Sequence, residues 1–137
     1  MTQELFEAYK STNFNVTEPK ITIKVDHVNP ILDELLLKHN AICYAYITAE
    51  NPYGKSYTKE QNELRHQQLL EATSHYVVYE GEGAGEDTTW PPERSLLILN
   101  ISKVEAIALG KQFEQNAIVL GNIYEAPELV ICVEWDV

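Results

Sequence analysis

Uncharged polar side chains stand at the ends of several elements that the sequence predicts, together with one tryptophan and one glutamate. Amide groups both donate and accept hydrogen bonds, so several of them at one end of a sheet could line a pocket for a neutral polar ligand. The alternative is that they cap helices and hold loops in place. The candidate ligand-binding residues are Thr48, Asn51, Asn62, Trp90, Glu93, Ser95, Gln115 and Asn116.

Glu93 and His66 are the candidate catalytic residues, each as a general base. Partial burial of Glu93 would raise the pKa of its carboxyl group toward the range that suits proton transfer. His66 lies four residues after Asn62 on the same face of a predicted helix, and histidine exchanges protons near neutral pH. The alternative for His66 is a structural role. Spacing selects no carboxylate pair from Glu50, Glu63, Glu80 and Glu93.

Other catalytic and metal-binding patterns are absent from the sequence. None of the four histidines has metal-ligand spacing, and no serine lies in a GxSxG motif. Cys43 and Cys132 lie far apart in apolar, strand-like runs, which predicts reduced and mostly buried thiols. The GEGAG run at 81–85 is flanked by acidic residues, which favours a flexible connector over a phosphate-binding loop. We therefore predict no metal and no cofactor.

Four helices and six strands are predicted to position these residues. Pro30 suits a first helical turn, and two further helices begin at capping boxes, Thr58 with Gln61 and Ser102 with Glu105. The expected helices are 3–10, 30–40, 58–73 and 102–113. The expected strands are 21–25, 41–48, 76–80, 95–100, 116–122 and 127–135.

The order of these elements predicts an α/β (α+β) fold, with a single mixed β-sheet of about five to six strands covered by three to four helices. The run 41–48 is nearly all apolar, so we place it centrally, where both faces are buried. The strands 116–122 and 127–135 are close enough for a hairpin, and 81–93 is expected to be irregular. A length of 137 residues predicts one domain, 1–137.

The charge restricts the class of partner. The chain has 10 basic and 21 acidic side chains, a net charge of −11, with most of the excess in residues 67–137. Such a surface repels phosphates, so we expect no nucleic-acid partner and no binding to anionic membranes. No signal peptide and no stretch of about 18 apolar residues is visible, which favours a cytoplasmic location. The charge either serves solubility or attracts a basic protein partner.

Three segments resemble those that define a bacterial family, the domain of unknown function 3293 family. They are ITAENPYGKSYTKEQNELRHQQLL (47–70), WPPERSLLIL (90–99) and AIALGKQFEQNAIVLG (106–121), and the similarity covers about 42–133. The chain has Glu-Arg-Ser at 93–95 where the family pattern has Glu-Pro-Ser. The family has no established activity, so the resemblance implies a fold and a candidate site without a reaction. The residues that match its motifs are Thr48, Ala49, Asn51, Pro52, Asn62, Trp90, Glu93, Ser95, Phe113, Gln115, Asn116 and Ala117.

Taken together, these features predict a small bacterial cytoplasmic protein that binds a small polar or nucleotide-like ligand in an Asn/Gln/Ser/Trp-lined pocket. Two other functions stay open: an acidic protein-interaction module, and a small hydrolase with Glu93 or His66 as base. The pocket hypothesis requires that Asn51, Asn62 and Glu93 converge in the fold, together with Ser95 and Gln115. The sequence identifies neither the ligand nor the oligomeric state.

Overall fold

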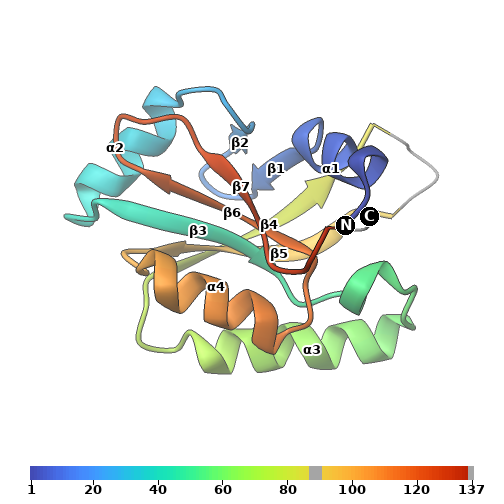
Figure 1. Ribbon diagram of the computed structural model, residues 1–137. Coiled ribbons are helices and arrows are strands. Elements are labelled where there is room, and N and C mark those ends of the chain that lie inside the picture. The colour runs from blue at the N-terminus through green and yellow to red at the C-terminus, as the bar shows by residue number, and fades with distance from the viewer. Residues whose placement is uncertain (87–90, 136–137) are drawn as a thin grey trace.

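The computed structural model describes residues 1–86 and 91–135, which form one seven-stranded sheet with helices on both faces (Figure 1). The helices are α1 (Gln3–Lys10), α2 (Pro30–Lys38), α3 (Lys59–Ala72) and α4 (Lys103–Gln112), with a 3-10 turn η1 (Pro52–Gly54). The strands are β1 (Asn13–Val16), β2 (Ile21–Ile23), β3 (Cys43–Thr48), β4 (Val78–Ala84), β5 (Glu93–Leu99), β6 (Ala117–Asn122) and β7 (Glu128–Ile131).

The predicted class, α+β with a single sheet covered by helices, is confirmed, but the sheet is antiparallel and not mixed as predicted. The strand order is β2-β1-β4-β5-β3-β6-β7, and all six neighbouring pairs in the described part of the chain are antiparallel. The sheet therefore has one strand more than the upper predicted number. The predicted hairpin near the C-terminus is present as the β6–β7 pair.

Strand β3 lies between β5 and β6 and is buried on both faces. Ala45 and Ile47 belong to the core beneath α3 and α4, whereas Tyr44 and Tyr46 belong to a second core with α2 and the β1–β2 pair. The prediction that 41–48 form a central strand is confirmed.

The helices begin at the residues that the sequence indicates. The Asn29 side chain caps α2 just before Pro30, and Thr58 forms both hydrogen bonds of a capping box with Gln61 at the start of α3. The Ser102 side chain caps α4. Among the described helices, none combines the length and the apolar character needed to cross a membrane.

Two parts of the strand prediction are wrong. Strand β1 was not predicted, and residues 81–84, expected to be irregular, form the second half of β4 between β1 and β5. Gly81 explains the pairing, because a Cβ atom there would lie 1.9 Å from the carbonyl oxygen of Asn15. The glycine-rich run is therefore part of the sheet, where glycine permits a close approach of the β1 backbone.

Both cysteines are free, as predicted, but each is half-buried rather than buried. The Cys43 thiol donates a hydrogen bond to the carbonyl oxygen of Ile101 at 3.2 Å. Burial raises the pKa of both the Cys43 and the Cys132 thiol. Both side chains are therefore held as protonated, weakly reactive thiols at neutral pH.

Gly81→Ala should destabilise the protein by about 1–3 kcal/mol, because the added methyl group collides with backbone that cannot move without breaking the β1–β4 pair. Gly83→Ala is the matched control, since its Cβ would meet only side-chain atoms at 3.8 and 4.0 Å. Urea denaturation followed by circular dichroism measures both free energies of unfolding. An equal loss in the two variants would contradict the explanation for Gly81.

Candidate functional site

A cavity of about 830 Å³ lies between α1 and one end of the sheet, where β3 ends and β5 begins. Its wall combines polar residues at this end with apolar side chains that include Phe14 and Tyr46. Five of the eight predicted ligand-binding residues line it: Thr48, Asn51, Glu93, Ser95 and Gln115. The structure thus brings together residues from three separate segments of the chain.

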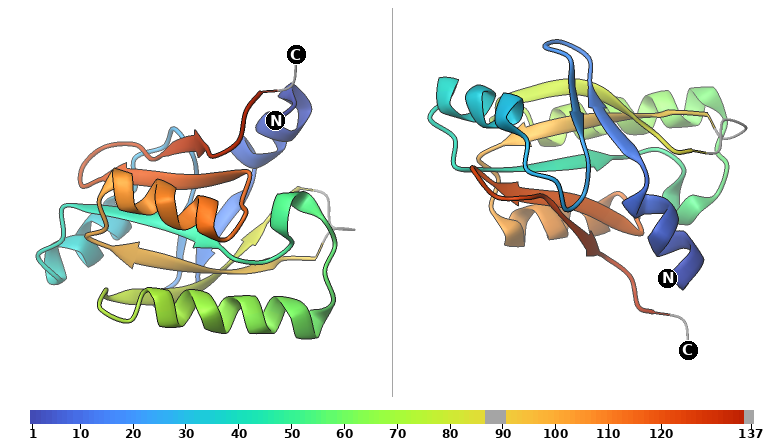
Figure 2. Two further views of the ribbon diagram at one scale, coloured as in Figure 1. Left: turned by 60° about the horizontal axis from the view of Figure 1, so that its bottom comes forward. Right: turned by 90° about the horizontal axis from the view of Figure 1, so that it is seen from above.

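Helix α1 closes one side of the cavity. The Tyr9 hydroxyl lines it and accepts a hydrogen bond from Nδ2 of Asn116 at 3.4 Å, so Asn116 supports the wall from behind. Helix α1 lies beside the C-terminal segment (Figure 2). There the N-terminal ammonium donates to the carbonyl oxygen of Glu134 at 2.8 Å, and Phe6 packs edge-to-face against Trp135.

Asn51 is the centre of the polar end of the cavity. Its backbone is left-handed, with φ 48° and ψ 63°, a conformation that asparagine tolerates better than most residues. Its backbone N–H donates to Oδ1 of Asn62 at 2.9 Å, and Nδ2 of Asn62 returns a hydrogen bond to Oδ1 of Asn51 at 2.9 Å. The backbone N–H of Tyr57 donates to the same Oδ1 at 3.0 Å. Since backbone N–H groups only donate, both amide orientations are fixed.

This orientation leaves Nδ2 of Asn51 to donate to Oε2 of Glu93 at 2.8 Å. Asn62 therefore does not reach the cavity, contrary to its predicted role as a ligand-binding residue. It holds Asn51, and Asn51 holds the carboxyl group of Glu93. The physical reason is that Asn62 lies in the first turn of α3, directly beside the left-handed turn that ends β3.

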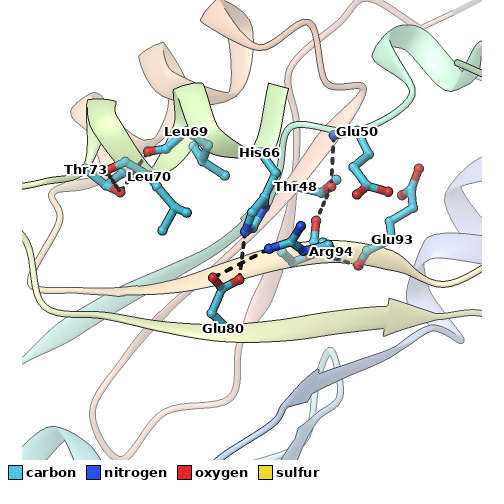
Figure 3. Close-up of polar contacts among 10 residues, drawn as sticks. Thr48, Glu50, His66, Leu69, Leu70, Thr73, Glu80, Glu93 and Arg94 are labelled. Atoms are coloured by element: carbon cyan, nitrogen blue, oxygen red, sulfur yellow. Dashed lines mark hydrogen bonds and ion pairs between the residues drawn. The ribbon is translucent and has the colours of Figure 1, made fainter. Parts of the chain in front are cut away.

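The Glu93 carboxyl group is half-buried, and its pKa is raised to about 7. Burial is the main cause, the charge of Glu50 adds to it, and the hydrogen bond from Asn51 partly opposes it. The side chains of Glu50 and Glu93 point toward the same region (Figure 3). The carboxyl group can therefore hold or release a proton near neutral pH.

Glu50 is a buried residue whose pKa is also raised, mainly by burial, while the backbone and charge of Arg94 oppose the shift. Its backbone N–H donates to Oγ1 of Thr48 at 3.1 Å, and that hydroxyl donates to the carbonyl oxygen of Arg94 at 2.7 Å. The Ser95 hydroxyl likewise donates to the carbonyl oxygen of Glu93 at 3.1 Å. Thr48 thus links β3 to β5, whereas Ser95 bonds to the backbone of its own strand, and both residues line the cavity.

Gln115 is 7% exposed, and its amide nitrogen is fully used. Nε2 donates to the carbonyl oxygens of Glu50 and Phe113, each at 3.1 Å. No group among residues 1–86 and 91–135 donates to its Oε1. Gln115 therefore combines both roles considered for the amides: it fixes a loop and presents an acceptor at the cavity.

His66 lies on the other side of the sheet and does not line the cavity. It is fully buried beneath α3, and its Nε2 lies 2.7 Å from Oε1 of Glu80, which also faces the Arg94 guanidinium at 3.8 Å (Figure 3). This position removes His66 as a base for a ligand in the cavity. Trp90 lies outside the described residues.

Most residues that line the cavity were not predicted, among them the aromatic residues Tyr9, Phe14 and Tyr46. Tyr9 and Tyr46 lie in elements that the sequence predicts correctly, but no local pattern indicates that α1 crosses the end of β3. Phe14 belongs to β1, the strand that was not predicted. The spacing of the glutamates in the sequence does not pair Glu50 with Glu93, and only the fold shows that the two lie side by side (Figure 3).

Comparison with known proteins identifies one family. The model of a family described as "Protein of unknown function (DUF3293)" matches residues 47–118, which is more than half of the chain. This segment contains every predicted ligand-binding residue. No curated protein and no solved structure matches the chain.

Asn62→Ala should lower the free energy of unfolding by about 1–3 kcal/mol, because it leaves the Asn51 N–H without its acceptor. Gln67→Ala, at an exposed position of the same helix, is the control and should change stability little. Urea denaturation measures both. Unchanged stability in Asn62→Ala would show that its amide does not hold the site together.

Glu93 should make stability depend on pH in a defined direction. Its carboxyl group binds a proton in the folded protein up to about pH 7 and in the unfolded chain only up to about 4.5. Its contribution to stability is therefore fully present below pH 4.5 and is lost as the pH rises through 7. Glu93→Gln should gain stability relative to wild type between pH 5 and pH 8, whereas Glu125→Gln, at an exposed position, should not. A constant difference across this range would rule out the raised pKa.

Proposed function

The chain belongs to the DUF3293 family, and we propose that it binds a small polar organic ligand in the cavity between α1 and the sheet. One observation carries this proposal: a carboxyl group with a pKa raised to about 7 is fixed by Asn51 and Asn62 at the wall of an already formed cavity. Fixed polar groups in an apolar concavity are characteristic of small-molecule sites.

The dimensions and composition of the cavity support a ligand with a polar and an apolar part. About 830 Å³ lies within the range of small-molecule pockets. Glu93 and Gln115 lie at the polar end, and Phe14, Tyr46 and Leu129 contribute apolar surface. A ligand of one or two rings with a single polar group would satisfy both parts.

The charge of the wall argues against a phosphate-bearing, nucleotide-like ligand. Glu4, Glu7, Glu86 and Glu93 line the cavity, and no Lys, Arg or His from the described part of the chain does. Phosphates are normally held by arginine, lysine or free backbone N–H groups at a helix start. The ligand is therefore proposed to be neutral or cationic.

A second function, a small hydrolase, is favoured by the pKa of Glu93 alone. A general base works best when its pKa lies near the working pH, and Glu93 satisfies that condition. Its ordered hydrogen bond to Asn51 would hold the carboxyl group toward a bound water or substrate. Turnover of the bound ligand, abolished in Glu93→Gln, would distinguish this function from binding alone.

The binding function is tested with four probes of similar size: benzyl alcohol, benzamide, benzamidine and benzoate. In ¹⁵N–¹H NMR titrations, at least one should shift the backbone signals of Thr48, Asn51 and Gln115. Ala8→Trp should abolish these shifts, because Ala8 is exposed on α1 and lines the cavity, so the indole fills it at little cost to folding.

Ala126→Trp, at an exposed position away from the cavity, is the matched control and should bind like wild type. Shifts that are scattered over the surface and survive in Ala8→Trp would contradict a binding cavity. The acidic surface would then become the leading candidate for function, with a basic protein as its partner.

A further inference from the structure

We propose that the group recognised in the cavity is a basic nitrogen that carries at least two N–H donors, such as a primary ammonium or an amidinium. This inference rests on the proposed binding function and names its ligand class. The inference follows from a comparison of two sets of atoms in the cavity wall: those that already form hydrogen bonds within the protein, and those that do not.

Most hydrogen-bond donors of the cavity wall are used inside the protein. Nδ2 of Asn51 donates to Glu93, and Nε2 of Gln115 donates to two carbonyl oxygens. The hydroxyls of Thr48 and Ser95 both donate to backbone carbonyls. Within the described ranges, the Tyr9 hydroxyl and the second N–H of Asn51 Nδ2 are donors of the wall that lack an acceptor.

Two acceptor atoms of the cavity wall receive no hydrogen bond from the described residues. Nδ2 of Asn51 donates a hydrogen bond to Oε2 of Glu93, whereas no described residue donates to Oε1 of that carboxyl group. Oε1 of Gln115, on a side chain that is more than nine-tenths buried, also has no donor among the described residues. Neither oxygen is fully buried, and both residues line the cavity, so a ligand that hydrogen-bonds to these acceptors must bring N–H or O–H groups.

The negative charge around the cavity favours a positively charged donor over a neutral one. Glu4 and Glu7 face the cavity from α1, Glu86 lines it after β4, and Glu50 lies beside Glu93. The Arg94 guanidinium faces Glu80 on the other side of the sheet and its charge acts on Glu50, but it does not line the cavity. A cavity lined by one sign of charge concentrates ligands of the opposite sign.

Aromatic side chains supply a surface for the rest of the ligand. Phe14 and Tyr46 pack edge-to-face with ring centroids 5.4 Å apart, and both line the cavity together with Tyr9. Aromatic faces attract organic cations as well as apolar groups. The cavity therefore offers an acidic end for a basic nitrogen and an aromatic wall for the carbon framework attached to it.

A metal ion is a poorer occupant for the same atoms. Among residues 1–86 and 91–135, no group of three or more His, Cys, Asp or Glu side chains is arranged to hold a metal. A calcium ion needs six to eight oxygen ligands, whereas an amidinium can be bound by fewer acceptors, with its other N–H groups hydrated.

The test compares benzamidine, benzamide and benzoate, which share one ring and differ in the charge and donors of the polar group. At pH 8, calorimetry and NMR should show benzamidine binding at least about tenfold more tightly than benzamide, since a hydrogen bond to a charged group contributes about 1.5–3 kcal/mol. Benzoate should not bind. Glu93→Gln should lose that preference, and Glu125→Gln should keep it.

The affinity for benzamidine should also rise between pH 6 and pH 8 in wild type, as Glu93 loses its proton, and should stay constant in Glu93→Gln. Benzamidine remains cationic throughout this range. The other titratable groups facing Glu93 are Glu50 and Tyr9, with Glu4, Glu7 and Glu86 farther along the wall. They remain in the Glu93→Gln variant, so the comparison isolates Glu93.

The outcomes separate this inference from the proposed function. If benzamide or benzoate shifts the cavity signals as strongly as benzamidine, the ligand class is wrong and the binding function stands. If no probe shifts them, both fail. If benzamidine binds equally well to Glu93→Gln and to Ala8→Trp, its binding reflects surface charge alone, and the inference is overturned.

Discussion

The orientation of one amide group, that of Asn51, is the constraint on which the site depends. Two N–H groups converge on its Oδ1, from the backbone of Tyr57 and from Asn62, so only its nitrogen can face Glu93. The arrangement requires a left-handed residue at the end of β3 and a helix that starts at Thr58 through its capping box. The junction between strand and helix thus determines where the carboxyl group lies.

The sheet separates a packed side from an open side. Apolar side chains pack beneath α3 and α4, and Arg65 of α3 donates to the carbonyl oxygens of Ala49, just after β3, and of Phe113, at the end of α4. On the other side, α2 and the β1–β2 pair cover only part of the surface. Helix α1 has no buried residue, so it covers the remaining end without filling it. The cavity is the space that this incomplete packing leaves.

The sequence could predict the fold class, the central strand and the grouping of most site residues, because these follow from apolar patterns and capping signals. It could not predict β1, whose four residues alternate asparagine with apolar side chains, or the glycines in β4, since glycine is depleted in strands. Both depend on a pairing between distant segments. The same limit applies to Asn62 and His66: spacing placed them on one helical face, yet one reaches Asn51 and the other Glu80.

The carboxyl group of Glu93 is unfavourable for folding and could be replaced without losing its structural contact. A glutamine at this position would accept the same hydrogen bond from Asn51 through its Oε1, with no charge to desolvate. It would also remove the repulsion from Glu50. Packing and hydrogen bonding therefore explain why an acceptor stands at position 93, but they do not explain why it is an acid. The proton and the negative charge are what a glutamine lacks, and both are directed toward the cavity. An acid at position 93 is therefore what the proposed ligand-binding function requires and what the fold alone does not.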